Sequence, residues 1–123
     1  MINKKYDKEQ NVLFVENSGR LDFETMKSYF SSFKNYSKYT KSLYILEDAR
    51  AVNVKFSSEH LAQFSKTLSQ IATKFNEVRH AVLLDEKMNF AYAMMINAGV
   101  PNSNYIMEVF SNEELALNWV KNR

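Results

Sequence analysis

Leu43-Tyr-Ile-Leu-Glu-Asp48 opens the stretch of sequence that decides the fold. Its apolar run is typical of a buried strand, and Ala49-Arg-Ala-Val-Asn-Val-Lys-Phe56 follows it as a long turn. Ser57-Ser58-Glu59-His60-Leu61 then predicts the capped start of an amphipathic helix, because serine is a preferred N-cap residue. In an α/β sheet, ligands bind at the carboxyl ends of strands, so this crossing from strand to helix is the first candidate site.

Apolar runs elsewhere in the chain predict four more strands. They are Ile2–Tyr6, Val12–Val15, Ala81–Leu84 and Tyr105–Phe110. We expect the second of these to end at Asn17-Ser-Gly19, with Gly19 at a positive φ.

Apolar side chains at helical spacing predict four helices between and after the strands. Their expected caps are Asp22, Ser57 or Ser58, Asn89 and Ser111. The third helix, Phe90–Ala98, should stop at Gly99, because Pro101 follows two residues later. The last helix should bury Trp119 against the sheet.

The resulting order is β-β-α-β-α-β-α-β-α, which predicts an α/β protein. We expect a five-stranded, mostly parallel sheet with one antiparallel edge strand and helices on both faces. The 123 residues carry no linker or repeat and are interpreted as a single domain, 1–123.

The composition sets limits on the chemistry. Hydrophobic residues make up 46% and charged residues 24% of the chain, as in an ordinary globular protein, and the net charge is only +2. Without cysteine, the chain has no disulfide, thiolate catalysis or cysteine metal site. We expect no secretory signal, because no apolar run follows Lys4 and Lys5, and no apolar run approaches the ~20 residues of a membrane span, so we expect a cytoplasmic protein.

Three segments carry a resemblance to a known family. They are the strand ending at Asp48 with Ser57, Ser58 and Leu61 after it, the run His80-Ala-Val-Leu-Leu-Asp85, and the ending Glu108–Trp119. Together they resemble the SpoIIAA-like family, which is related to the STAS domains of anti-sigma-factor antagonists. The resemblance covers nearly the whole chain and implies a SpoIIAA/STAS-like fold.

The resemblance also implies where a partner or ligand would bind. In STAS antagonists the turn before the helix reads roughly Asp-Ser-Ser-Gly, and its serine is phosphorylated by a partner kinase. Here Phe56 stands in place of the acid and Glu59 in place of the glycine, so we interpret Ser57 and Ser58 as helix caps. The SpoIIAA-like branch is compared with CRAL-TRIO lipid-binding domains, which implies an apolar ligand. The binding residues expected around this turn are Asp48, Arg50, Phe56, Ser57 and Ser58.

A second hypothesis is a small enzyme that uses acids at strand ends. Four acids lie at the carboxyl ends of neighbouring predicted strands, and converging carboxylates can bind Mg²⁺ or act as acid and base. They are Glu47, Asp48, Asp85 and Glu86, with Asp48 and Asp85 as the main candidates. The acidic pair and lysine of a receiver domain are absent from the matching positions. His60 and His80 lack the spacing of a metal pair, so no metal or cofactor is predicted and structural roles are favoured.

A third hypothesis is a basic and aromatic surface that binds RNA or an anionic membrane. Lysines and tyrosines alternate between Thr25 and Leu46, and this segment contains no aspartate or glutamate. They are Lys27, Lys34, Lys38 and Lys41 with Tyr29, Tyr36, Tyr39 and Tyr44. A solvated helix face explains the same pattern, and the small net charge favours that interpretation over nucleic acid.

The helix Phe90–Ala98 is apolar nearly all round, so one side must meet something besides the sheet. We expect Tyr92, Met95 and Ile96 to point away from the strands, toward either a homodimer interface or an apolar pocket opening near Phe56. The sequence therefore predicts a non-catalytic module that acts by protein contact or by binding an apolar small molecule or lipid. Asp85, Tyr92 and Met95 complete the expected binding residues.

Overall fold

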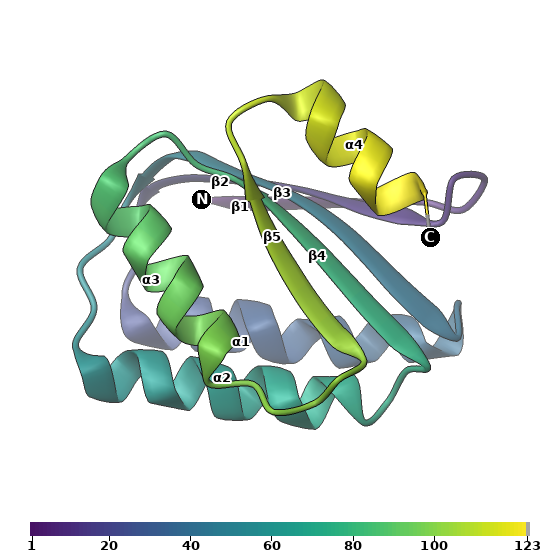
Figure 1. The fold of residues 1–123 in the computed structure, drawn as a ribbon, viewed down its shortest axis with the longest axis horizontal. Coiled ribbons are helices and arrows are strands. Elements are labelled where there is room, and N and C mark those ends of the chain that lie inside the picture. Colours follow the sequence, from purple (N-terminus) through teal and green to yellow (C-terminus); the bar gives the residue numbers. More distant parts are fainter. Residues whose placement is uncertain (123) are drawn as a thin grey trace.

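The computed structural model of the chain describes residues 1–122, and a five-stranded sheet lies at its centre (Figure 1). The strands are β1 (Ile2–Asp7), β2 (Val12–Arg20), β3 (Ser42–Asn53), β4 (Glu77–Leu83) and β5 (Tyr105–Phe110). They lie in the sheet in chain order. β1 pairs antiparallel with β2, and every other neighbouring pair is parallel. The predicted fold class is therefore confirmed.

The helices cover the two faces of the sheet unequally. They are α1 (Phe23–Ser32), the 3-10 helix η1 (Phe33–Lys38), α2 (Ser58–Ala72), α3 (Lys87–Ala98) and α4 (Glu113–Lys121). Parallel crossovers are right-handed, and here each one moves one strand further in the same direction, so α1, α2 and α3 share one face. α4 follows the last strand and packs on the other face, against β3, β4 and β5 (Figure 1).

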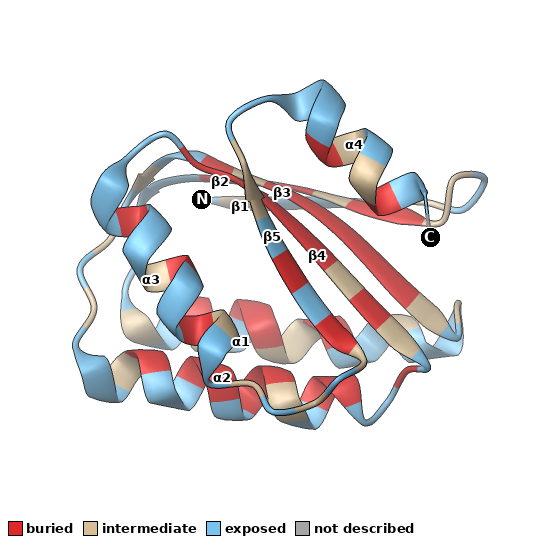
Figure 2. Cartoon of the chain, in the orientation of Figure 1, coloured by how far each residue is buried: buried red, intermediate tan, exposed pale blue. Residues whose placement is uncertain are grey.

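Each face of the sheet has its own core. The main core lies under α1, α2 and α3, and fully buried side chains such as Leu13, Phe33 and Phe64 belong to it. The smaller α4 core contains Leu46 and Val120. Because both faces are covered, β4 and the first part of β3 are largely buried (Figure 2), as in other parallel sheets. Within residues 1–122, no helix is long and apolar enough to cross a membrane.

β3 is longer than the sequence predicts. The expected turn after Asp48 continues as strand to Asn53, because β2 also continues and pairs Ser18 with Ala51 and Arg20 with Asn53. The prediction that β2 ends at Asn17-Ser-Gly19 is therefore wrong as well. A shift in pairing between Glu16 and Ser18 lets the two strands stay in contact. Gly19 has φ +78°, which confirms its positive φ.

The helix starts agree with the sequence in two of four cases. The side chain of Asp22 accepts from the backbone N–H of Thr25, and Ser57 caps α2. α3 begins three residues early, with Glu86 at its N-cap position, so Asn89 lies inside the helix and is buried. The cap of α4 is Asn112 and not Ser111, because the Asn112 side chain accepts from the N–H of Leu115.

Trp119 is mostly but not fully buried and packs against the α4 core, in line with the expected packing of the last helix on the sheet. Its ring packs against Phe110 with a centroid distance of 5.7 Å, and the Arg79 guanidinium lies 4.8 Å above it. Residues 116 and 120 are the ones that α4 buries fully. The indole therefore forms the rim of the α4 core rather than its centre.

The end of α3 is fixed closely against α2. A Cβ atom at Gly99 would come within 2.5 Å of the Ser65 hydroxyl oxygen, so only glycine fits this approach. The Ser65 hydroxyl donates to the Ile96 carbonyl oxygen at 2.7 Å. This contact anchors the C-terminal end of the helix that covers the site described next.

Candidate binding cavity

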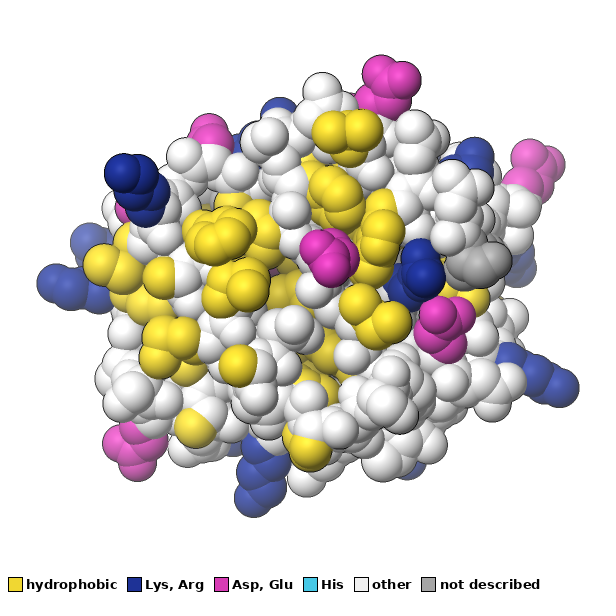
Figure 3. Space-filling view, in the orientation of Figure 1, with side chains coloured by type: hydrophobic (Ala, Val, Ile, Leu, Met, Phe, Trp, Pro, Cys, Tyr) yellow, Lys and Arg dark blue, Asp and Glu magenta, His cyan; other side chains and the backbone are white. Residues whose placement is uncertain are grey.

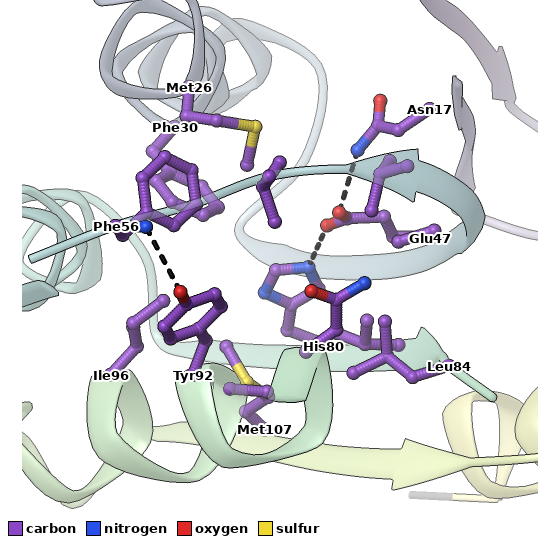
Figure 4. A pocket seen from close by; sticks show the side chains of 16 residues that line it. Asn17, Met26, Phe30, Glu47, Phe56, His80, Leu84, Tyr92, Ile96 and Met107 are labelled. Atoms are coloured by element: carbon purple, nitrogen blue, oxygen red, sulfur yellow. Dashed lines mark hydrogen bonds and ion pairs between the residues drawn. The ribbon is translucent and has the colours of Figure 1, made fainter. Parts of the chain in front are cut away.

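A cavity of about 60 Å³ lies in the main core between the sheet, α1 and α3. A water molecule needs about 10–15 Å³ by this kind of measure, so the cavity has room for several waters or a small organic group. Most of its wall is apolar, with Met26 and Phe30 from α1 and Ile96 from α3 (Figure 4). The partly exposed wall residues mark its mouth, and they are Val52, Val54, Phe56 and Tyr92.

The mouth lies between α3 and the segment that joins β3 to α2. The backbone N–H of Phe56 donates to the Tyr92 hydroxyl at 3.1 Å, and the two rings are 5.5 Å apart (Figure 4). Phe56 also packs edge-on against Phe64 of α2, at 4.9 Å between ring centroids. Phe56 and Tyr92 are both predicted binding residues, and the fold brings them together at the mouth.

The polar side of the cavity is organised around Glu47, which is only 4% exposed. Its Oε2 atom accepts from the Asn17 side-chain amide at 2.7 Å. Its Oε1 atom accepts from the Tyr29 hydroxyl and lies 2.7 Å from His80 Nε2. A buried carboxylate is tolerated where hydrogen-bond donors surround it, and three donors converge here.

His80 has partners on both of its ring nitrogens and is fully buried. With Nε2 protonated toward Glu47, Nδ1 accepts from the Tyr105 hydroxyl at 2.9 Å, so a neutral ring satisfies every contact. Burial raises the pKa of Tyr29 well above its usual value, and the Glu47 charge raises that pKa further. The same two causes raise the pKa of Tyr105, so both phenols keep the protons that they donate.

Two amide side chains at the cavity have polar atoms without a partner. Asn17 Oδ1 is buried and accepts no hydrogen bond within the described chain. Asn89 lines the cavity from the first turn of α3, is 7% exposed, and its side chain makes no hydrogen bond to any residue that the structure describes. Buried polar groups are normally paired, so a free amide at a cavity indicates that a ligand or water completes it.

The other predicted site residues lie away from the cavity. Asp48 follows Glu47 in β3 and therefore faces the opposite side of the sheet, where its carboxylate accepts from Arg50 at 2.8 and 2.9 Å. The Arg50 guanidinium holds the pKa of Asp48 below its usual value. Asp85 is exposed beyond the end of β4. The pKa of Arg50 is raised mainly by Asp48, and the charge of Asp85 adds a smaller effect in the same direction. Asp48 lies within β3 and not at its carboxyl end, so the strand-end pair of acids does not form as predicted.

The predicted serines and Met95 are also outside the cavity. The Ser57 hydroxyl accepts from the His60 N–H at 3.1 Å, and the Ser57 N–H donates to His60 Nδ1 at 3.3 Å, so the side chain is a helix cap. Ser58 is exposed in the first turn of α2. Met95 is 52% exposed on the outer face of α3. Ile96, expected outside, is buried and lines the cavity, so that part of the prediction is wrong.

The buried polar centre of the site was not predicted, because Glu47 was expected only as one of several acids at strand ends. Glu47 is two residues after Ile45 and four after Leu43, so its side chain lies on the same face of β3 as theirs. Strand alternation therefore places a charged residue among buried side chains. That signal was available in the sequence. Asn89 was expected to be a helix cap. His80 was expected to have a structural or surface role, but its partners Glu47 and Tyr105 were not foreseen. Within residues 1–122, no group of three or more His, Cys, Asp or Glu is placed to hold a metal ion.

The chain has an α/β fold of the SpoIIAA-like kind, and its cavity lies beneath the helix that follows β4. The chain is similar to a solved structure of an uncharacterised protein from the DUF3478 family with a SpoIIAA-like fold, from Shewanella loihica PV-4. The two share 16% sequence identity with a TM-score of 0.65, over 98% of this chain and 92% of the other. The sequence matches no protein-family model, and it matches no curated protein.

Proposed function

We propose that this protein is a non-catalytic binding module that encloses an apolar small molecule in the cavity beneath α3. The observation that carries the proposal is a mostly apolar cavity whose wall holds two unpaired amide groups, Asn17 Oδ1 and the Asn89 side chain. Small-molecule sites are typically concave and apolar, with a few polar groups that orient the ligand. A mouth lined by Phe56 and Tyr92 gives such a ligand an entry path.

The polar network supports binding over catalysis. A general base or nucleophile needs a free atom within hydrogen-bond reach of its substrate. His80 has both ring nitrogens occupied, and the Glu47 carboxylate already accepts three hydrogen bonds. These residues hold one another in place, and they leave Asn17 Oδ1 and the Asn89 amide as the polar groups available to a guest.

A matched pair of variants on α3 tests the proposal. Ala93 is buried in the cavity wall and Ala91 is exposed on the same helix. Ala93→Trp should fill the cavity, whereas Ala91→Trp adds the same ring to the surface. Native mass spectrometry of gently purified protein should find a bound molecule on the parent and on Ala91→Trp, but not on Ala93→Trp.

Circular dichroism of both variants controls for folding. The same comparison is then repeated by adding toluene to each protein and measuring its binding. If the parent protein carries no molecule and also fails to bind toluene, the proposal is wrong. Equal binding by the folded Ala93→Trp variant would likewise place the ligand elsewhere.

A second function, protein contact, is favoured by the outer face of α3. Met88, Phe90, Met94 and Met95 are between 47% and 55% exposed there. Figure 3 shows hydrophobic side chains gathered over the side of the molecule where α3 lies. Methionine-rich apolar patches are common at interfaces, so we propose that this face joins two copies of the chain. Met95→Lys should lower the sedimentation coefficient without changing toluene binding, and a parent protein that sediments as a monomer would contradict the dimer.

A further inference from the structure

We infer that the cavity selects a ligand whose buried end is neutral and can both donate and accept a hydrogen bond, as an amide or an alcohol does, and that it excludes anions. The inference rests on the proposed binding function and specifies its ligand class. It follows from the charges that surround the cavity and from the chemistry of Asn89.

The cavity wall contains no lysine and no arginine among its described residues. A carboxylate or phosphate placed inside would therefore have no cation to pair with, and burying an unpaired charge is strongly unfavourable. His80 cannot serve as that cation, because its two nitrogens face Glu47 and Tyr105.

The wall instead contributes a negative group. Glu47 lies in the cavity lining and is 4% exposed, so its charge is poorly screened by water. It would repel a second anion in the same enclosed space. The N-terminal turn of α3 carries a partial positive charge, but Asp85 and Glu86 immediately precede that turn and already place two carboxylates beside it.

Asn89 supplies the attractive part of the recognition. Its amide has an NH₂ donor and a carbonyl acceptor, and neither has a partner within the described chain. A primary amide or an alcohol can satisfy both, whereas a carboxylate can only accept. A site built to hydrogen-bond one group discriminates strongly against analogues that lack it.

Hexanamide and hexanoate test the inference directly, because they have the same number of heavy atoms and differ in charge at neutral pH. Titration followed by NMR of the ¹⁵N-labelled protein gives a Kd for each, with toluene as a probe that has no polar end. We expect hexanoate to bind at least about tenfold more weakly than hexanamide. Hexanoate binding as tightly as hexanamide would overturn the inference and leave the binding function standing.

Asn89→Leu removes the amide at nearly constant size, and Asn97→Leu makes the same change on α3 outside the cavity lining. Asn89→Leu should weaken hexanamide about tenfold and leave toluene unchanged, while Asn97→Leu should change neither. If toluene binds and Asn89→Leu leaves hexanamide unaffected, the role of Asn89 is refuted. If none of the three probes binds, the binding function itself fails together with the inference.

Discussion

Glu47 and Asp48 are adjacent in the chain, yet they lie in opposite environments on the two faces of the sheet. Glu47 faces the main core, is 4% exposed, and is held by Asn17, Tyr29 and His80. Asp48 faces the α4 side, is partly exposed, and pairs with an exposed Arg50. Strand alternation alone separates them. Two adjacent carboxylates therefore contribute differently to the stability of the fold, and only Glu47 belongs to the candidate site.

The two faces also differ in what they contain. The main core has three helices over it, a buried polar network and a cavity. The α4 core is smaller, and its large aromatic ring, Trp119, is on the rim. The helix that follows β4 covers space that is not completely filled, whereas the last helix closes its face with Ala116 and Val120, both fully buried.

The largest expected effect comes from truncating the buried carboxylate. Glu47→Ala should lower the free energy of unfolding by about 3–5 kcal/mol, because three buried donors lose their acceptor. Asp48→Ala, its neighbour on the other face, should cost about 1 kcal/mol or less, as exposed ion pairs do. Urea denaturation of both variants measures the contrast. Equal losses would mean that the network around Glu47 is not the stabilising feature of the main core.

A smaller effect is expected on the α4 face. Trp119→Ala should cost about 1–3 kcal/mol, less than the ~3–5 kcal/mol of a fully buried aromatic residue, because part of the ring is already in water. The loss includes its contacts with Phe110 and Arg79. Thermal denaturation provides the measurement. A cost near that of Glu47→Ala would indicate that α4 packs more deeply than its exposed rim suggests.

The smallest effect depends on pH and concerns the main core alone. The pKa values of Tyr29 and Tyr105 are raised in the folded protein, since burial and the Glu47 charge oppose ionisation. The unfolded phenols ionise near pH 10, so the stability they contribute is present below that pH and is lost as pH rises above it. As the pH rises above 10, each of these two phenols should lower the free energy of unfolding by at most about 1.4 kcal/mol per pH unit.

Tyr29→Phe should make the alkaline decline shallower than in the parent protein. A matched control is Tyr39→Phe, because Tyr39 is 53% exposed. Stability curves between pH 9 and 11 measure the slopes. An unchanged slope in Tyr29→Phe would show that its phenol is not held protonated by the network.

The architecture was predictable because its signals are local. Short apolar runs with intervening helical periodicity fix the number, type and order of the elements, and side chains such as Asp22 and Ser57 mark two helix starts. The length of β3 was not predictable in this way. Its last residues are largely exposed, so they lack the apolar pattern of a buried strand, and their pairing with β2 is a long-range property.

The candidate site was only partly predictable, for two reasons. Phe56 and Tyr92 were expected at the pocket, but α3 is apolar nearly all round, so periodicity could not determine which face turns inward. The polar residue of the helix, Asn89, in fact marks the inner face. The network of Glu47 joins residues from β2, α1, β3 and β4, and no local pattern in a single sequence reveals such a combination.

The agreement between chain order and sheet order has a consequence for how the molecule assembles. Each strand pairs beside the one that precedes it in the chain, so a polypeptide emerging from the ribosome can extend the sheet from one edge, strand by strand. Up to the end of β3, Glu47 has Asn17 and Tyr29 but not His80, which arrives with β4. We therefore expect the nascent sheet to remain loosely ordered until about two thirds of the chain is made, and to become rigid when His80 reaches Glu47.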